Sequence, residues 1–306
     1  NFTPGVMERF GLGYEAVRAV RPDIVYLAMS MQGASGPERD YLGYGASMVA
    51  LTGLQHLTGL PEREPEGTGT NFPDHIPNPC HAAFAVLAAL RHRRRTGEGQ
   101  YIDIAQTEPA IALLGPAVLE LTVNGRTLTR NGNEHWGAAP HGVYRCAGED
   151  RWIAICVMNE AHWPALRRVL GDPQWMAQPR WSRAASRHRD RRELDGLLER
   201  ETARWNAEEL MHALQARGVP AGVVQNAKDV IENDPQLGHR GHWVKLAHPE
   251  MGETIYNASP FRFSRTPTQL SRPAPLLGEH TRQVLRELAG LEEAQIESLI
   301  NEGALK

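Results

Sequence analysis

Short apolar runs alternate with longer periodic segments along the chain, and this alternation defines the expected elements. Residues 24–29 read Ile-Val-Tyr-Leu-Ala-Met between Pro22 and Gly33, a pattern typical of a buried strand. Residues 79–95 are apolar on every face through their middle, which predicts a buried helix. A second strand is predicted at 100–104, after the glycines that end this helix. Strands that alternate with helices favour an α/β fold.

The rest of the chain divides into further helices, short strands and one long aperiodic stretch. Helices are expected at 43–53, 108–121, 163–170, 191–205 and 207–216, strands at 142–145, 152–157, 243–247 and 253–256, a turn into a strand at 218–224, and two amphipathic helices within 278–305. Residues 124–140 are polar, contain glycine and lack a period, which indicates a linker or an active-site loop. This order predicts a large lobe in two segments, 1–123 and 236–306, with a smaller lobe at 124–235 between them.

Composition and charge exclude several classes of protein. Of the 306 residues 41% are hydrophobic, yet no apolar run reaches the roughly 18 residues of a membrane span, so we expect no membrane partner. The 33 basic and 36 acidic side chains nearly balance, which argues against nucleic-acid binding. Three cysteines without CxxC spacing favour reduced thiols and a cytoplasmic location. No Cys/His set has the spacing of a metal site.

Asp74 is the candidate catalytic residue that the local sequence singles out. Asn78 is a good N-cap and Pro79 suits the first helical position, so Asp74 is expected just outside the N-terminus of the helix at 79–95. Positive potential there favours the ionised carboxylate, which suits a nucleophile. The alternative is an acidic residue that only helps to cap the helix. His75 beside it is either a general base or a structural histidine.

Seven short motifs follow one another from the N-terminus to the C-terminal region. They are Asn1-Phe2-Thr3-Pro4-Gly5, Gly11-Leu12-Gly13-Tyr14, Gly36-Pro37, Asp74 with the apolar run 82–90, Arg95-Thr96-Gly97-Glu98-Gly99-Gln100, Gly218-Val219-Pro220-Ala221-Gly222 and Pro275-Leu276-Leu277-Gly278-Glu279-His280-Thr281. In this order they make the chain resemble the family III CoA-transferases, which include formyl-CoA transferase and carnitine CoA-transferase.

The resemblance implies an α/β fold of two lobes, with a Rossmann-like large lobe and a smaller inserted α+β lobe. It also implies an interlocked homodimer. In the family a nucleotide-fold segment precedes the stretch that here begins at Asn1, so the N-terminal part of the large lobe is expected to be missing.

The implied activity is the transfer of coenzyme A from an acyl-CoA thioester to a carboxylic acid. Asp74 would attack the thioester to give an aspartyl anhydride and then an aspartyl-CoA intermediate. The expected partners are therefore an acyl-CoA and a small carboxylic acid. No cofactor and no metal are expected, because coenzyme A enters as part of a substrate.

Two further groups of site residues are implied by the resemblance. The glycine-rich loop of the family matches residues 132–140, where donors for an oxyanion are expected at Gly137, Ala138 and Ala139. Residues that would bind CoA are Asn1, Phe2, Thr3, Arg9 and Tyr44. Arginine suits the phosphates of CoA through charge-assisted hydrogen bonds.

Two alternatives remain open in the sequence. The related α-methylacyl-CoA racemases pair the aspartate with a histidine, but Tyr44 occupies that place and no histidine lies between Ala28 and Gln55. A tyrosine is a weak base at neutral pH, since its reference pKa is near 10. The second alternative is a catalytically inert fragment or subunit, because the chain is expected to lack its N-terminal part.

Overall fold

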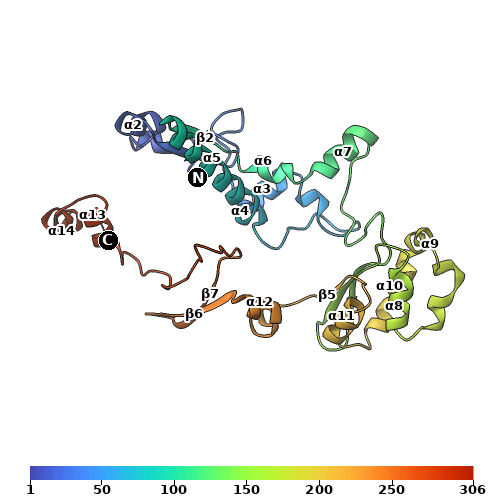
Figure 1. Cartoon of the computed structure of the whole chain (residues 1–306). Helices are drawn as coiled ribbons and strands as arrows, with labels where there is room; N and C mark the ends of the chain where they lie inside the picture. The colour runs from blue at the N-terminus through green and yellow to red at the C-terminus, as the bar shows by residue number, and fades with distance from the viewer. Residues whose placement is uncertain (306) are drawn as a thin grey trace. The chain divides into compact units, whose positions relative to one another are not determined.

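The computed structural model describes residues 1–305 and divides them into two compact units. The first unit holds residues 1–150 and 154–221, and the second holds residues 151–153 and those from 222 onward. Both units contain helices and strands, so the mixed α/β prediction is confirmed (Figure 1). The predicted bounds of the two lobes stay a prediction.

The first part of the first unit is built around two short parallel strands. Its elements are α1 (Val6–Arg9), α2 (Tyr14–Val20), β1 (Val25–Ala28), α3 (Gly45–Leu51), η1 (Gln55–Leu57), α4 (Phe72–His75), α5 (Pro77–Thr96), β2 (Gln100–Asp103), α6 (Thr107–Ala112) and α7 (Gly115–Asn124). Strands β1 and β2 pair in register from Val25 opposite Gln100 to Ala28 opposite Asp103. Both strand predictions are confirmed, and helix α5 precedes β2 and packs against β1.

Two glycines allow the chain to turn from α5 into β2. Gly97 has a φ of +79°, and its amide donates to the carbonyl of Arg93 at 2.8 Å, which is a left-handed helix stop. Gly99 then passes so close to β1 that a Cβ there would lie 2.0 Å from the carbonyl oxygen of Ile24. Only a residue without a side chain lets β2 begin beside β1.

Helix α5 differs from its prediction at its start and in its burial. It begins at Pro77 rather than after Asn78, because the fixed φ of proline suits the first helical position. Asn78 is therefore no cap; it is 1% exposed, and its Nδ2 donates to Oε1 of Gln106 at 3.4 Å. The predicted burial of the helix is wrong in its middle, where Phe84 is 77% exposed and Leu87 is 66% exposed.

The helix predicted at 108–121 is two helices, α6 and α7. Pro116 disfavours helical dihedrals in the residue before it, which accounts for the break near Gly115. Helix α7 also carries exposed apolar side chains, with Leu119 at 62% and Val123 at 73% exposed. Apolar surfaces on α5 and α7 are therefore left uncovered in the single chain.

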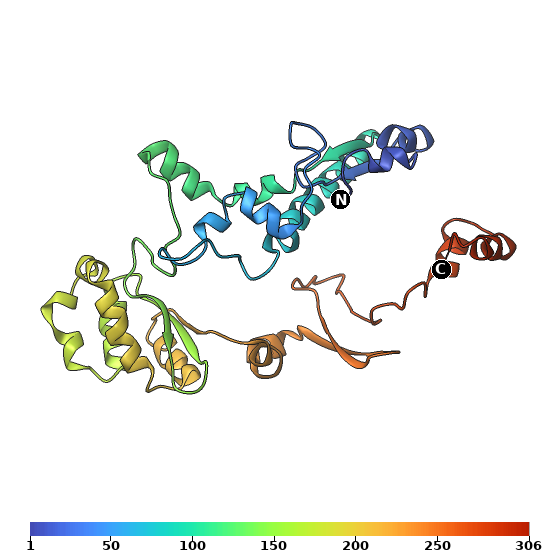
Figure 2. The same cartoon turned by 180° about the vertical axis from the view of Figure 1, so that it is seen from behind.

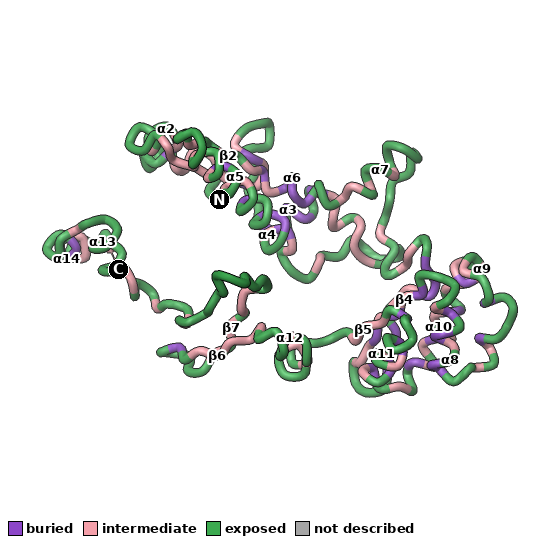
Figure 3. Tube along the Cα trace, in the orientation of Figure 1, coloured by how far each residue is buried: buried purple, intermediate pink, exposed green. Residues whose placement is uncertain are grey.

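The second part of the first unit holds most of the large side chains that are fully buried. The elements from residue 141 to residue 223 are β3 (His141–Arg145), β4 (Trp152–Cys156), α8 (His162–Val169), η2 (Gln174–Ala177), η3 (Pro179–Trp181), α9 (Ala184–Arg189), α10 (Arg191–Thr202), α11 (Ala207–Gln215) and β5 (Ala221–Val223). The strand order is β3-β4-β5. Figure 3 shows buried stretches of the chain in these elements, and the large side chains that are fully buried there are Leu166, Met176, Trp181, Leu194, Leu198, Leu210 and Leu214.

The second unit contains a hairpin and two C-terminal helices. Its further elements are η4 (Asp229–Asn233), α12 (Pro235–Arg240), β6 (Trp243–His248), β7 (Gly252–Asn257), α13 (Thr281–Glu287) and α14 (Glu293–Asn301). Strands β6 and β7 are antiparallel, and an extended run leads from β7 to α13 (Figure 2). Helix α14 starts at a capping box between Glu292 and Gln295. Within residues 1–305, no helix is both long and apolar enough to cross a bilayer.

Candidate active site

Asp74 lies in the short helix α4, directly before the N-terminus of α5. Its amide and that of His75 both donate to the carbonyl of Asn71, at 3.0 and 3.2 Å, which holds the backbone of α4 in place. The Asp74 side chain is half-buried. Among residues 1–305 its carboxylate oxygens accept no hydrogen bond, so both remain available to a ligand.

A cavity of about 360 Å³ opens beside Asp74, and we call it the Asp74 cavity. It brings together residues that are far apart in the sequence: Asn1, Phe2, Thr3, Ser30, Arg39, Tyr44, Gly45, Met48, Asp74 and Gln106 are among those that line it. The list includes the candidate nucleophile and four of the five residues predicted to bind CoA. Tyr44 is 88% exposed and precedes the first residue of α3.

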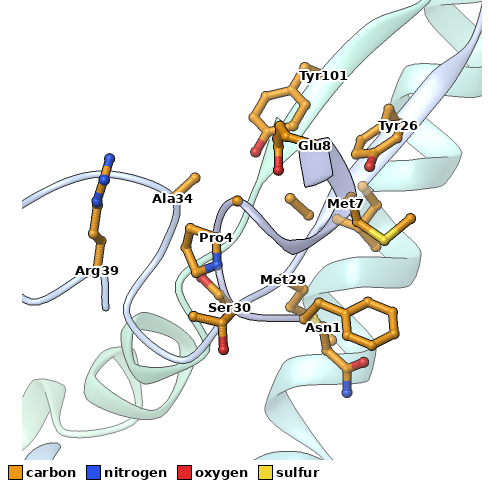
Figure 4. A pocket seen from close by; sticks show the side chains of 15 residues that line it. Asn1, Pro4, Met7, Glu8, Tyr26, Met29, Ser30, Ala34, Arg39 and Tyr101 are labelled. Atoms are coloured by element: carbon orange, nitrogen blue, oxygen red, sulfur yellow. The ribbon is translucent and has the colours of Figure 1, made fainter. Parts of the chain in front are cut away.

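A second cavity, of about 580 Å³, adjoins the first and shares part of its lining. Residues 1–4, Ser30 and Arg39 line both cavities, while Tyr26 and Tyr101 belong to the second alone. Figure 4 shows Arg39, Ser30 and Asn1 around this second cavity, with Tyr26 and Tyr101 at its far side. Burial raises the pKa of Tyr101, with a smaller contribution from Asp103, so its hydroxyl remains a donor at neutral pH.

Two polar side chains of the Asp74 cavity were not foreseen from the sequence. Ser30 follows β1 and is 8% exposed, and its Oγ has no hydrogen-bond partner within residues 1–305. Gln106 follows β2; its Nε2 donates to the carbonyl of Met29 at 2.8 Å. Both residues come within three positions of the ends of parallel strands, and the carboxyl ends of neighbouring parallel strands lie at one edge of the sheet. That placement is the sequence signal that would have found them.

The cavities contain a different arginine from the one predicted. Arg9 is exposed and lines neither cavity. Arg39 lines both, and its Nε donates to Asp40 at 3.4 Å. His75 is exposed and does not line the Asp74 cavity. His75 is therefore not placed to act as a general base in the Asp74 cavity.

The loop predicted to supply oxyanion donors does not line the Asp74 cavity. In this conformation two of its amides are already bound: Gly137 donates to Nδ1 of His135 at 3.1 Å, and Ala138 donates to the carbonyl of His135 at 3.5 Å. Ala138 and Ala139 are buried, at 4% and 3% exposed, while Trp136 is 88% exposed. The role assigned to Gly137, Ala138 and Ala139 stays a prediction.

A buried arginine holds this loop. Arg187 is fully buried in α9, and its Nε donates to the carbonyl of Ala139 at 2.8 Å. Its other nitrogens donate to the carbonyl of Trp181 at 2.9 Å and to Glu160 at 3.1 Å, and its guanidinium lies 5.0 Å from the ring of Trp163. Burial lowers the pKa of Arg187, but the bonds to three oxygens satisfy the charge.

Within the described part of the chain, no group of histidine, cysteine, aspartate and glutamate side chains is arranged to hold a metal ion. The site consists instead of one carboxylate, hydroxyl and amide groups, and an arginine around a cavity. Such a set suits nucleophilic attack on a carbonyl carbon by a carboxylate, with neighbouring donors for the oxyanion that forms.

Comparison with known proteins gives a consistent result. The profile of CoA-transferase family III matches residues 1–281. The chain is 32% identical over 300 residues to a succinyl-CoA–D-citramalate CoA-transferase of Chloroflexus aurantiacus, covering 98% of this chain and 74% of the relative. It is 32% identical over 293 residues to a succinate–glutarate CoA-transferase of Agrobacterium fabrum, covering 95% of this chain and 72% of that one.

A solved structure is similar in fold as well. The crystal structure of a CAIB/BAIF family protein from Brucella suis superimposes with a TM-score of 0.85 at 30% sequence identity. The match covers 94% of this chain and 74% of that protein.

Proposed function

The chain belongs to CoA-transferase family III and transfers coenzyme A from an acyl-CoA thioester to a carboxylic acid, and we propose that Asp74 is the nucleophile of this transfer. One observation carries the proposal. The unbonded carboxylate of Asp74 shares a cavity with Tyr44 and with residues 1–3, which are the segments expected to bind CoA.

The proposed reaction has two symmetrical halves. In the first half, a carboxylate oxygen of Asp74 attacks the thioester carbonyl to give a tetrahedral oxyanion, and the C–S bond then breaks, so that CoA leaves as a thiolate and an acyl-aspartyl mixed anhydride remains. The thiolate then attacks the aspartyl carbonyl, so that the donor acid leaves and an aspartyl-CoA thioester remains. In the second half, the acceptor carboxylate attacks this thioester and releases the thiolate, which attacks the acceptor carbonyl. The products are the new acyl-CoA and free Asp74.

Each attack passes through an oxyanion that needs a hydrogen-bond donor. Ser30 is our proposed donor from the cavity itself, because its buried hydroxyl has no partner within residues 1–305. We also retain Gly137, Ala138 and Ala139 as proposed donors, with the loop in a different conformation. Arg9 remains our proposal for a contact to a CoA phosphate, and no separate cofactor takes part.

We propose a short dicarboxylic acid as the acceptor. The relatives from Chloroflexus aurantiacus and Agrobacterium fabrum are named for citramalate and for glutarate, and both names include succinate or succinyl-CoA. One carboxylate of such an acid would react at Asp74, and the other needs a counter-charge. Arg39 is the arginine of the cavity and can hold a carboxylate through two parallel hydrogen bonds.

A homodimer in the cytoplasm is the assembly and compartment that we propose. Exposed apolar side chains on α5 and α7, among them Phe84, Leu87 and Val123, offer surface that a second copy would cover. Sedimentation at micromolar concentration should give twice the chain mass, and a single-chain mass would contradict the dimer. Cysteines without the pattern of a disulfide framework favour a reducing compartment.

The test of the proposed function is the variant Asp74→Asn. Asparagine has nearly the same shape but cannot form an anhydride, so transfer from succinyl-CoA to a panel of acids should fall by at least about 1000-fold. Asp172→Asn removes an exposed carboxylate that pairs with Arg167 and is the matched control. Trapping with hydroxylamine should modify the peptide that contains Asp74, as read by mass spectrometry. Transfer that persists in Asp74→Asn would refute the proposal.

The racemase alternative is separated by an isotope measurement. No histidine lines the Asp74 cavity among the described residues, so a second base for inversion is not at hand. In deuterated water, a transferase leaves the α-carbon of the acyl group unlabelled while CoA moves to the acceptor. Deuterium at that carbon without CoA transfer would identify a racemase, and neither event would identify an inert subunit.

A further inference from the structure

Gly45 is the first residue of α3, is buried, and lies directly against the carboxylate of Asp74. A Cβ on Gly45 would lie 2.3 Å from Oδ2 of Asp74. It would also lie 2.6 Å from Cγ and 2.7 Å from Cβ of Asn71. All three distances are well inside the roughly 3.5–4.0 Å at which carbon atoms pack. Position 45 therefore has no room for a side chain while Asp74 keeps its place.

The Asp74 carboxylate lies nearest to a Cβ at position 45 and is the group most free to move. The backbone of α4 is tied by the two amide bonds to the carbonyl of Asn71. The backbone of α3 is tied as well, because the amide of Met48 donates to the carbonyl of Tyr44 at 3.0 Å. The Asp74 side chain is free to turn, since its oxygens accept no hydrogen bond within residues 1–305. Rotation of Asp74 would relieve the contact with Oδ2, while the contact with Cβ of Asn71 would remain.

We propose that Gly45 is a positioning residue for the transfer reaction: its missing Cβ allows the carboxylate of Asp74 to lie against the first turn of α3. This inference rests on the proposed function of Asp74. A side chain at position 45 would turn the reacting oxygens away from the thioester carbon. Misplacement of a reacting group by about 1 Å costs about 100-fold in rate.

Two other glycines provide matched comparisons. Gly115 is the first residue of α7, as Gly45 is of α3, but a Cβ there meets nothing within 4 Å. Gly43 lines the same cavity as Gly45, and its Cβ would meet Sδ of Met31 at 2.6 Å and Cβ of Ser47 at 3.0 Å, but no atom of Asp74. The end of a methionine side chain can move aside without displacing Asp74. Comparison of Gly43→Ala with Gly45→Ala thus distinguishes the effect of a narrower cavity from the effect of a displaced Asp74 carboxylate.

The kinetic test compares Gly45→Ala, Gly43→Ala and Gly115→Ala with the parent chain. For Gly45→Ala we expect kcat to fall about 100-fold while KM for the acyl-CoA stays close to the parent value. Gly115→Ala should keep the parent rate, and Gly43→Ala should lose less in kcat than Gly45→Ala. Asp74→Asn is measured in parallel. If Asp74→Asn remains active, the proposed function fails; if Asp74→Asn is inactive but Gly45→Ala keeps the parent kcat, this inference alone fails.

A stability measurement tests the same contact without activity. Gly45→Ala should lower Tm in the parent chain and lower it less in an Asp74→Ala background, because the carboxylate that meets the methyl group is gone. An equal loss of Tm in both backgrounds would overturn the inference. If Gly45→Ala does not fold, folding of the double variant supports the inference. If the double variant also fails to fold, Asn71 rather than Asp74 excludes the side chain, and the inference is wrong.

Discussion

The guanidinium of Arg187 donates from Nε to the carbonyl oxygen of Ala139 at 2.8 Å, and so ties α9 to the loop that precedes β3. Because Arg187 is fully buried, water cannot replace its hydrogen bonds if the side chain is removed. The loop that precedes β3, which resembles the glycine-rich loop of the family, is therefore held in place by the buried guanidinium of Arg187.

Arg187→Met should lower the free energy of unfolding by about 3 kcal/mol, because two buried carbonyl groups lose their donor. These are the carbonyls of Ala139 and Trp181. Arg189→Met is the matched control, since Arg189 is an exposed residue of the same helix that pairs with Asp190. It should change stability by no more than about 0.5 kcal/mol. Denaturant titration of both variants measures the difference, and equal losses would contradict the role of Arg187.

Glu160 should make the first unit sensitive to acid. The amide of Ala184 donates to Glu160 at 2.8 Å, and this bond, with a smaller effect of Arg187, lowers the pKa of Glu160 below its ordinary value of 4.5. A lowered folded-state pKa means that the stabilisation is complete above pH 4.5 and is lost as the pH falls through the folded-state value. Glu160→Gln should therefore flatten the decline of Tm below pH 4.5. An unchanged slope would show that Glu160 does not contribute.

Ser30→Ala should slow the transfer reaction without lowering stability. Removing an unpartnered buried hydroxyl relieves its desolvation cost, so Tm should stay level or rise. The rate of transfer should fall about 10-fold if the hydroxyl donates to the reacting carbonyl. Thr52→Val is the contrasting variant, because Thr52 is buried and already donates to the carbonyl of Val49 at 3.0 Å. It should lose stability and keep its rate.

Arg39→Met should change the choice of acceptor acid. Loss of a charge-assisted hydrogen bond of about 1.5–3 kcal/mol raises KM for a dicarboxylate by about 10- to 150-fold. A monocarboxylic acceptor has no second charge to lose, so its KM should stay near the parent value. Arg18→Met is the matched control, because Arg18 and Arg39 have equally exposed side chains and Arg18 lines neither cavity. Equal changes for both acids would remove Arg39 from acceptor recognition.

The sequence predicted those parts of the fold that depend on local pattern. Strands β1 and β2 and helix α5 are predictable because each is marked by a local apolar run and by glycines at its end, all within a few neighbouring residues. The cap at Asn78 was assigned wrongly, because two prolines two positions apart offered two helix starts and only packing against Gln106 chooses between them. The burial of α5 was also overestimated, since composition does not say whether another segment covers Phe84.

The candidate site was predicted in its chemistry and only partly in its members. Asp74 was singled out by its place before a helix and by the family resemblance. Ser30 and Arg39 were missed because their position beside Asp74 depends on contacts between segments more than thirty residues apart in sequence. Gly45 was missed for a related reason, because a close approach between α3 and α4 produces no hydrophobic periodicity in the sequence.

The shared lining of the two cavities has a consequence for inhibitor design. Residues 1–4, Ser30 and Arg39 form a common wall, so fragments that fill the two cavities would meet there. A covalent linker of matched length would make binding of the second fragment intramolecular, at an effective concentration on the order of millimolar. Two weak fragments joined across Ser30 would thus bind more tightly without any new contact. A linker too short to span the common wall would remove this gain in affinity.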